Sequence, residues 1–384
     1  MSKVTTILKD LVALPSVNPR SATDLPPDLV GEQRVTEYVE GFIRGLKLDV
    51  IIQETGQPGR YNVGAAMLQG NDRGTLLLQS HMDTVGIGSD PGLLTPVERD
   101  GAIYGRGACD DKGSLAAMLA ALEAVARTPD RIENNVIVMA VVGEETGFEG
   151  SLALVTQPPT AGADFAVVGE PTECRIVTGC KGVGRWRIET SGTACHSAYP
   201  DKGVNAIYRM ARIVQELEGY QCELAGSIDD KLGPETVSVG TIRGGTAVNV
   251  VPDSCEIEVD RRLTRRVSPE QARDLVGQYL RGRGIDFEFA MSELSDAQPA
   301  ALVEDCHPGV RLLAGVSRLL GLDDTTGVVS YASDANRMNA AGIPTVVWGP
   351  GSIEVAHSRQ EFVSIADLET AVEFYRGVIL ATAL

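Results

Sequence analysis

The sequence predicts an α/β protein in which a mostly parallel central sheet is joined to a smaller, inserted α+β domain. Short apolar runs bounded by glycine and polar residues, at 74–80, 134–143 and 164–169, indicate strands buried on both faces, as in a parallel sheet. Between residues 180 and 294 the pattern changes to strand, helix, two strands, helix and strand, which is the split-βαβ order. The 384 residues are enough for two domains.

The first part of the chain alternates between the two kinds of periodicity. Ile7, Leu8 and Leu11 recur at helical spacing, and the segment from Pro15 to Pro19 ends that helix. Val35 marks the buried stripe of a second amphipathic helix. The expected elements are helices at 4–14, 29–46 and 114–127, and strands at 48–53, 61–68, 74–80, 134–143 and 164–169.

The inserted domain begins at a glycine-rich hinge around Gly179, Gly182 and Gly184. These glycines resemble a phosphate loop, but no strand-to-helix context and no following Lys-Ser or Lys-Thr supports that interpretation. We expect strands at 185–190, 235–243, 255–262 and 285–290, helices at 203–218 and 269–281, and then helices at 307–320 and 365–382 with a strand at 344–348. The predicted domains are therefore 1–179 with 295–384, and 180–294.

Composition excludes several classes of protein. A formal net charge of −18 makes nucleic acid an unsuitable partner, because phosphate binding needs a concentrated basic surface. No apolar run approaches the 18 residues of a membrane span, and the N-terminus lacks the pattern of a signal peptide. Seven scattered cysteines without a Cys-x-x-Cys pair are typical of reduced thiols. We expect a cytoplasmic protein that acts on a small molecule.

Acidic and histidine side chains follow the apolar strands at the positions where each strand ends. His81 and Asp83 follow the run at 74–80, and two residues apart in an extended chain their side chains point the same way. Carboxyl ends of parallel strands form one rim of the sheet, where ligands collect. Further candidates at this rim are Asp110, Glu144, Glu145, Glu170 and His357. Two histidines and several carboxylates are what a pair of zinc ions needs.

The motifs together resemble the co-catalytic zinc deacylases and peptidases, a family that contains acetylornithine deacetylase, succinyl-diaminopimelate desuccinylase, aminoacylase and glutamate carboxypeptidase. The resemblance covers nearly the whole chain. It is carried by His81-x-Asp83, Gly107-x-x-Asp110-x-Lys112-Gly113, Glu144-Glu145, Gly169-Glu170-Pro171-Thr172, His196-Ser197, Asn249-Val250-Val251-Pro252 and His357. It implies a zinc-peptidase-like catalytic domain and a ferredoxin-like lid and dimerisation domain.

The resemblance assigns roles to the residues at the sheet rim. It implies that Asp110 bridges two metal ions and is joined to Asp111 by a cis peptide bond. Glu144 would be the general base, acting on a water between the ions, and Asp83 would orient His81 or its strand end. The metal ligands that it implies are His81 and Glu170 for one ion, Glu145 and His357 for the other, and Asp110 for both. Zinc is the expected metal, with cobalt and manganese as alternatives.

The resemblance also implies residues that bind the substrate. Arg262 would bind the substrate carboxylate, although the run from Arg261 to Arg266 is also typical of a solvated face. His196 would reach from the partner subunit of a homodimer to stabilise the oxyanion, and the alternative is a histidine that caps the loop before Pro200. Asn249, Gly349 and Gly351 complete the expected substrate-binding set. Asp334 resembles a position near the site or a helix cap, and His307 is assigned no role.

The function that the resemblance implies is hydrolysis of the amide bond of an N-acyl amino acid. The segments 169–172, 349–352 and 356–357 are most similar to acetylornithine deacetylase, so N-acetylornithine or a similar N-acetyl amino acid is the expected substrate. The alternatives are a succinyl-diaminopimelate desuccinylase and a glutamate-type carboxypeptidase or dipeptidase. A non-catalytic metal-binding module is an alternative of another class, and the presence of Glu144 argues against it.

Overall fold

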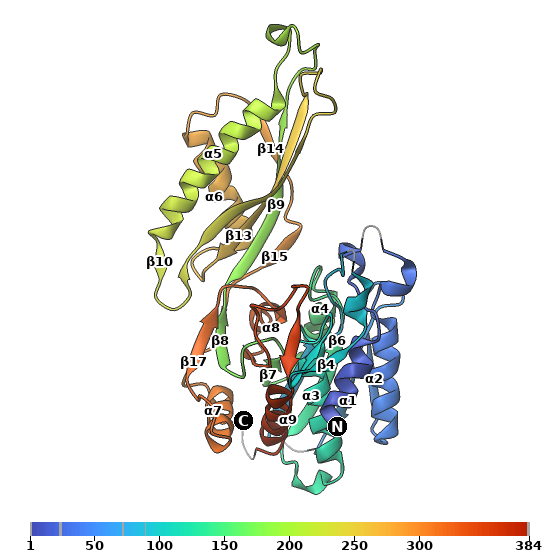
Figure 1. The fold of residues 1–384 in the computed structure, drawn as a ribbon. Coiled ribbons are helices and arrows are strands. Elements are labelled where there is room, and N and C mark those ends of the chain that lie inside the picture. The colour runs from blue at the N-terminus through green and yellow to red at the C-terminus, as the bar shows by residue number, and fades with distance from the viewer. Residues whose placement is uncertain (1, 23–24, 71–72, 89, 382–384) are drawn as a thin grey trace. The chain divides into compact units, whose positions relative to one another are not determined.

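The computed structural model describes residues 2–22, 25–70, 73–88 and 90–381, which form two compact units (Figure 1). The larger unit consists of Met1–Gly179, Leu302–Gly327 and Ser333–Leu384, and the smaller of Cys180–Ala301 and Val328–Ala332. The chain thus returns to the larger unit after Ala301 rather than after residue 294. The reason is β15 (Asp296–Gln298), which pairs antiparallel with a strand of the smaller unit.

The main sheet has nine strands in the described part of the chain. Their order is β1-β2-β6-β3-β7-β18-β8-β16, with β17 beside β8. The bounds are β1 (Val50–Glu54), β2 (Tyr61–Met67), β3 (Thr75–His81), β6 (Asn135–Val141), β7 (Phe165–Val168), β8 (Ile176–Cys180), β16 (Ala301–Leu302), β17 (Thr326–Val329) and β18 (Thr345–Val347). Strands β6, β3, β7 and β18 run parallel, which confirms the predicted α/β class.

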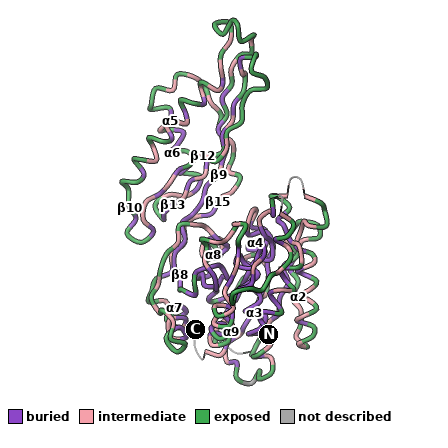
Figure 2. Tube along the Cα trace, viewed as in Figure 1, coloured by how far each residue is buried: buried purple, intermediate pink, exposed green. Residues whose placement is uncertain are grey.

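Helices cover this sheet on both faces, so its central strands are almost wholly buried (Figure 2). One apolar cluster joins the sheet to α1 (Lys3–Val12), α2 (Gln33–Gly45), α3 (Lys112–Ala126), α7 (Pro308–Leu319) and α9 (Ile365–Ile379). Outside this cluster, α4 (Glu149–Thr156) and α8 (Asp334–Ala340) contact each other and contact strands β2, β7 and β18. A separate small sheet contains β4 (Val97–Arg99), β5 (Ala102–Tyr104) and β19 (Phe362–Ser364).

Several elements differ from those that periodicity predicts. The second helix begins at Gln33 rather than at 29, because Pro27–Leu29 forms a separate 3₁₀ turn. The last helix ends at Ile379, and Thr382, where we expected its end, lies outside the described residues. Helix α4 was not predicted, because its eight residues are too few to show a helical period. None of the helices that the structure describes is long and apolar enough to cross a membrane.

The smaller unit has the predicted order of strand, helix, two strands, helix and strand. Its main elements are β9 (Gly182–Ser191), α5 (Ala206–Ala225), β12 (Thr236–Gly244), β13 (Ser254–Leu263), α6 (Pro269–Gly282) and β14 (Phe289–Met291). The strands form an antiparallel sheet in the order β12-β13-β9-β14. Burial alternates along β13, as expected for a sheet that is covered on one face. The core side chains of β9 and β13 pack against those of α5 and α6.

Helix boundaries in the smaller unit follow from their caps. Asn205 accepts a hydrogen bond from the backbone amide of Tyr208, so α5 begins at Ala206 rather than at 203. Ser268 and Gln271 form a reciprocal capping box at the start of α6. The start of α6 therefore coincides with the expected position at residue 269.

Candidate metal centre and active site

The candidate site lies at the carboxyl ends of adjacent parallel strands. The register pairs His81, the last residue of β3, with Val141 at the end of β6, and pairs Gln79 of β3 with Val168 at the end of β7. The turn that carries Glu144 and Glu145 follows β6, and Glu170 follows β7. Neighbouring strands that end at the same level therefore bring residues from three distant parts of the sequence to one rim.

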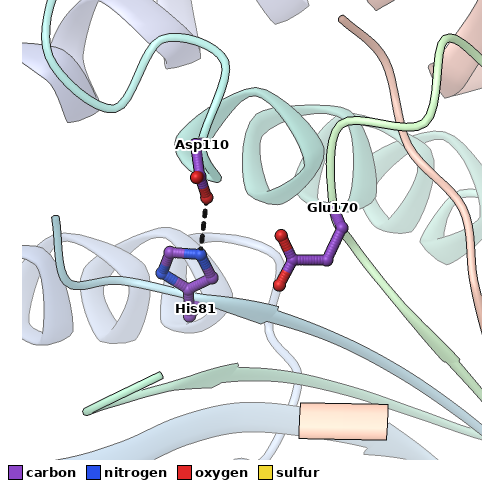
Figure 3. Close-up of side chains that lie close together, drawn as sticks. All are labelled: His81, Asp110 and Glu170. Atoms are coloured by element: carbon purple, nitrogen blue, oxygen red, sulfur yellow. Dashed lines mark hydrogen bonds and ion pairs between the residues drawn. The ribbon is translucent and has the colours of Figure 1, made fainter. Parts of the chain in front are cut away.

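His81, Asp110 and Glu170 form the first group of potential metal ligands (Figure 3). Their ligand atoms lie within 4.8 Å of one another, and all three residues are buried. His81 Nε2 lies 2.9 Å from Asp110 Oδ1. His81 Nδ1 lies 2.9 Å from the backbone carbonyl oxygen of Asp83, to which it donates. This bond fixes the ring so that Nε2 is the nitrogen that faces the other two ligands.

Asp110, Glu145 and His357 form the second group. Their ligand atoms also lie within 4.8 Å of one another. His357 Nε2 lies 3.1 Å from Asp110 Oδ2 and 3.2 Å from Glu145 Oε2. Asp110 therefore contributes one oxygen to each group, which is the geometry required of a bridging carboxylate. The peptide bond between Asp110 and Asp111 is cis, as the sequence resemblance implies.

The residues of these groups fit a pair of divalent cations. The buried Oε1 of Glu170 has no hydrogen-bond partner among the residues that the structure describes, so an oxygen of the first group is available to a ligand. Each group supplies one imidazole nitrogen and two carboxylate oxygens, a donor set that suits zinc, cobalt or manganese. Three protein ligands leave positions open, as in catalytic rather than structural metal sites.

The electrostatics of the site also favour cation binding. Burial raises the pKa of Glu170 well above its ordinary value, and the neighbouring Glu144 raises it further. Burial raises the pKa of Glu145 as well, with a further contribution from Asp110. Hydrogen bonds to Asp110 and Glu145 raise the pKa of the His357 imidazole to about 10. Burial and neighbouring carboxylates both disfavour the charged forms of Glu145 and Glu170, and divalent ions bound beside them would favour those charged forms.

Asp83 and Glu144 lie beside the two groups without belonging to either. Asp83 is fully buried, and its carboxylate accepts hydrogen bonds from the backbone amides of Gly143, Glu144 and Glu145 at 2.9–3.1 Å. Its carboxylate thus binds the turn after β6, while its backbone carbonyl binds His81. Glu144 is 9% exposed and stands next to the candidate ligand Glu145. Burial raises the pKa of Glu144 well above its ordinary value.

Gly349 and Gly351 belong to a loop that packs against Glu170 and against Cys109, the residue before Asp110. A Cβ atom at Gly349 would lie 2.5 Å from the backbone oxygen of Glu170 and 2.6 Å from Ser114 Oγ, and one at Gly351 would lie 2.5 Å from Cys109 Sγ. The backbone of Gly349 also exchanges hydrogen bonds with Thr172. The close packing explains both glycines, and the substrate contacts expected of them stay a prediction.

Sequence patterns missed several residues that support the site. The Asn18 side-chain amide donates to Asp83 Oδ2 at 2.7 Å. Glu361 accepts from the backbone amides of Cys109 and Asp110, and pairs with Arg106. These contacts join segments far apart in the chain and have no local signal. Ser333 caps α8, whereas the buried Asp334 accepts from the Gln79 side chain at 2.6 Å.

The remaining predicted residues belong to the smaller unit. His196 and Val250 form an isolated antiparallel bridge, and the Ser197 amide donates to the carbonyl oxygen of Asn249 at 3.1 Å, so the segments of His196 and Asn249 lie side by side. His196 Nδ1 accepts from the Ala198 amide at 3.0 Å. Arg262, on β13, forms a two-pronged ion pair with Asp260, at 2.8 and 3.2 Å.

The fold and the two ligand groups define a metal-dependent hydrolase. The sequence matches the model of peptidase family M20/M25/M40 over residues 77–381, and the chain belongs to that family. This confirms the family and the enzyme class that the motifs predict, a metallohydrolase that acts on amide bonds. The interpretation as a non-catalytic metal-binding module is therefore set aside.

Named relatives share much of the chain. Acetylornithine deacetylase of Myxococcus xanthus is 35% identical over 306 residues, which cover 78% of each chain. A probable carboxypeptidase of Emericella nidulans is 30% identical and covers 97% of this chain and 88% of its own. The crystal structure of an M20 family metallo-carboxypeptidase from Sulfolobus solfataricus has a TM-score of 0.80 at 18% identity, over 99% of each chain. This structural similarity shows a shared fold.

Proposed function

We propose that the protein hydrolyses the amide bond of an N-acyl amino acid, with N-acetylornithine or a similar N-acetyl amino acid as substrate. The observation that carries the proposal is the buried carboxylate of Glu144, which interacts electrostatically with His81, Glu145 and Asp110 but belongs to neither ligand group. It is therefore available to exchange protons with water and substrate. The substrate class is supported by the relative named acetylornithine deacetylase, which is 35% identical.

The proposed chemistry divides between the metal centre and the protein. When bound, the two ions would acidify a water and polarise the substrate carbonyl. His81, Asp110, Glu145, Glu170 and His357 would hold the ions, and Asp83 would hold the turn of Glu144 in place. The Glu144 carboxylate would accept the proton from the attacking water and return it to the leaving amine nitrogen. This assignment requires that Glu144 be needed for turnover of the substrate but not for binding of the metal ions.

Residues outside the two ligand groups would recognise the substrate. We assign the substrate carboxylate to Arg262, whose Nε and Nη2 atoms bind Asp260 and which would bind the substrate with its other N–H donors. Asn249 would bind the substrate backbone, and Gly349 and Gly351 would line the pocket. His196 would stabilise the oxyanion. In this proposal the protein is a homodimer formed through the smaller unit, and His196 serves the site of the partner subunit.

The proposed metal is zinc, with cobalt or manganese as substitutes, because imidazole and carboxylate ligands accept all three. The proposed location is the cytoplasm. The buried free thiols of Cys109, Cys174 and Cys255 support a reducing compartment.

A carboxypeptidase or dipeptidase activity is the second candidate, favoured by the carboxypeptidase relative that covers 97% of this chain. Desuccinylation is a third. A panel of N-acetyl, N-succinyl and dipeptide substrates decides among them by their kcat/KM values. We expect N-acetylornithine or another N-acetyl amino acid to have the highest value. A dipeptide or an N-succinyl substrate that exceeds it tenfold would overturn the proposed substrate class.

Removal of metal tests the proposed centre in the same assay. We expect a strong chelator to abolish activity and lower the thermal unfolding temperature, because ions that bind only the folded state stabilise it by mass action. Stoichiometric zinc, cobalt or manganese should restore both properties. Full activity in protein shown by elemental analysis to be free of metal would contradict the proposed centre.

A further inference from the structure

We propose that Arg106 and Glu361 form a clamp that positions two metal ligands, Asp110, which both groups share, and His357, which belongs to the second group only. This inference rests on the proposed metal centre. It assigns a role to two residues that lie outside both ligand groups. We call the pair the Arg106–Glu361 clamp.

Glu361 holds the main chain of the bridging residue. Its Oε1 atom accepts hydrogen bonds from the backbone amides of Cys109 and Asp110, each at 3.1 Å. The Glu361 side chain is 1% exposed, so these bonds form away from water, where charge-assisted hydrogen bonds are strong. One carboxylate oxygen therefore holds two successive backbone amides and fixes the main chain from which the Asp110 side chain extends.

Arg106 connects the Glu361 carboxylate to His357, the candidate metal ligand near the C-terminal end of the sequence. Its Nη1 atom forms an ion pair with Glu361 Oε2, and its Nη2 atom donates to the backbone carbonyl oxygen of His357 at 3.3 Å. The Arg106 side chain is 4% exposed. A single planar guanidinium thus joins the support of Asp110 to the main chain of His357.

The local fold places the two members of the clamp next to each other. Glu361 immediately precedes β19, and Arg106 follows two residues after β5. These strands pair antiparallel, with Phe362 opposite Tyr104, and the Gly105 amide donates to the carbonyl oxygen of Glu361 at 3.1 Å. The small sheet therefore anchors the clamp independently of the main sheet.

His357 needs such support more than the other ligands do. It has a left-handed backbone conformation, with φ of +62°, and its side chain is 51% exposed. By contrast, the His81 side chain is 1% exposed and ends a strand of the main sheet. Loss of the clamp should therefore weaken the ion of Asp110, Glu145 and His357 more than the ion of His81, Asp110 and Glu170.

A buried ion pair that serves stability alone is the competing explanation, and it predicts no such selectivity. The test removes the pair without leaving one buried charge behind. In R106M/E361M both members become apolar residues of similar length, so no buried charge is left unpaired, and the backbone amides of Cys109 and Asp110 lose the acceptor whose role is under test. The matched control is R261M/E235M in the smaller unit, where Arg261 and Glu235 form a buried pair at 2.7 Å with side chains 1% and 8% exposed.

The measurement is the pair of zinc dissociation constants, obtained by competition between metal-free protein and a chromophoric chelator. We expect R106M/E361M to raise the dissociation constant of the ion held by Asp110, Glu145 and His357 about 10- to 100-fold. A loss of this size, about 10- to 100-fold, is typical when a residue that hydrogen-bonds to a metal ligand is removed. The other constant should change by a smaller factor, because that ion shares only Asp110 with the clamp, and the control should keep both constants. H357A should weaken binding of the same ion, and adding R106M/E361M to H357A should weaken that ion less than it does in the wild type, because the clamp then has no His357 ligand to position.

Unchanged constants in R106M/E361M would overturn the proposal, and so would equal weakening of both ions. Circular dichroism establishes first that the variant is folded. If R106M/E361M does not fold, R106K takes its place as the test, because it keeps the positive charge and loses the planar guanidinium that joins Glu361 to His357. Unchanged binding of both ions in R106K would also overturn the proposal. The proposed function fails separately, when wild-type protein binds two ions but cleaves no N-acyl amino acid.

Discussion

Asp83 accepts a hydrogen bond from the backbone amide of Glu144, with 3.1 Å between Asp83 Oδ1 and the amide nitrogen. The same carboxylate accepts the amides of Gly143 and Glu145. Three successive peptide groups after β6 therefore converge on one buried side chain. The turn has this shape because Asp83 is an anion with enough acceptor sites for all three amides.

Replacing Asp83 tests this control of the turn. D83N keeps the shape of the side chain but has one acceptor oxygen, and its amide hydrogens would face backbone donors. We expect the free energy of unfolding to fall by about 1.5–3 kcal/mol, as for the loss of hydrogen bonds to a buried charged group. Denaturant unfolding measures the change, and kcat should fall because Glu144 moves. N18A, which removes the side-chain amide that donates to Asp83 Oδ2 at 2.7 Å, is the control and should have a smaller effect on both the free energy of unfolding and kcat.

Glu144 and Glu145 should respond differently to substitution, although they are neighbours. E144A should lower kcat by about 10²- to 10⁴-fold, the usual contribution of a general base, while two ions stay bound. E145A should lose the ion of the second ligand group, because its Oε2 lies 3.2 Å from His357 Nε2. Elemental analysis of metal content, together with steady-state kinetics, separates these effects. Equal loss of metal in both variants would show that the assigned roles are wrong.

The sequence predicted the parts of this fold that are encoded by adjacent residues. A run of buried residues that ends at His81 or before Glu144 reveals both a strand and its end, and parallel strand ends meet at one rim. Glu361 shows the limit of that reasoning. In the segment Arg359-Gln360-Glu361 it resembles any solvated charge, and its burial follows only from the pairing of β19 with β5.

Short elements were missed for a related reason. The three residues of β15 are too few to show alternation, and their pairing with β9 moved the end of the smaller unit from residue 294 to Ala301. The role that the resemblance gives Asp83, to orient His81 or its strand end, stays a prediction. Its contact with the turn of Glu144 could not be predicted, because it depends on how β3 and β6 are aligned.

Gly349 should not tolerate a side chain. In G349A the new Cβ atom would lie 2.5 Å from the backbone oxygen of Glu170 and 2.6 Å from Ser114 Oγ, so the Glu170 turn must move. We expect a stability loss of about 1–3 kcal/mol, typical of overpacking, together with reduced metal content. G41A in α2 is the matched control, because a Cβ atom at Gly41 meets nothing within 4 Å and alanine favours a helix. Normal metal content in G349A would contradict the proposed packing of Glu170.

His196 provides the last prediction, because the tetrahedral intermediate of amide hydrolysis carries an oxyanion that needs a donor. Such a donor contributes about 2.7–4 kcal/mol, so H196A should lower kcat by roughly 10²- to 10³-fold without loss of metal. In the proposed homodimer, His196 acts on the partner's site. Mixing inactive E144A subunits with inactive H196A subunits then creates heterodimers in which one site has an intact Glu144 from one chain and an intact His196 from the other. We expect activity to recover on mixing, and each heterodimer should have up to about half of the activity of a wild-type homodimer, because one of its two sites is intact. Subunit exchange is verified with two affinity tags, and absence of recovery in verified heterodimers would show that His196 acts on its own subunit or has no catalytic role.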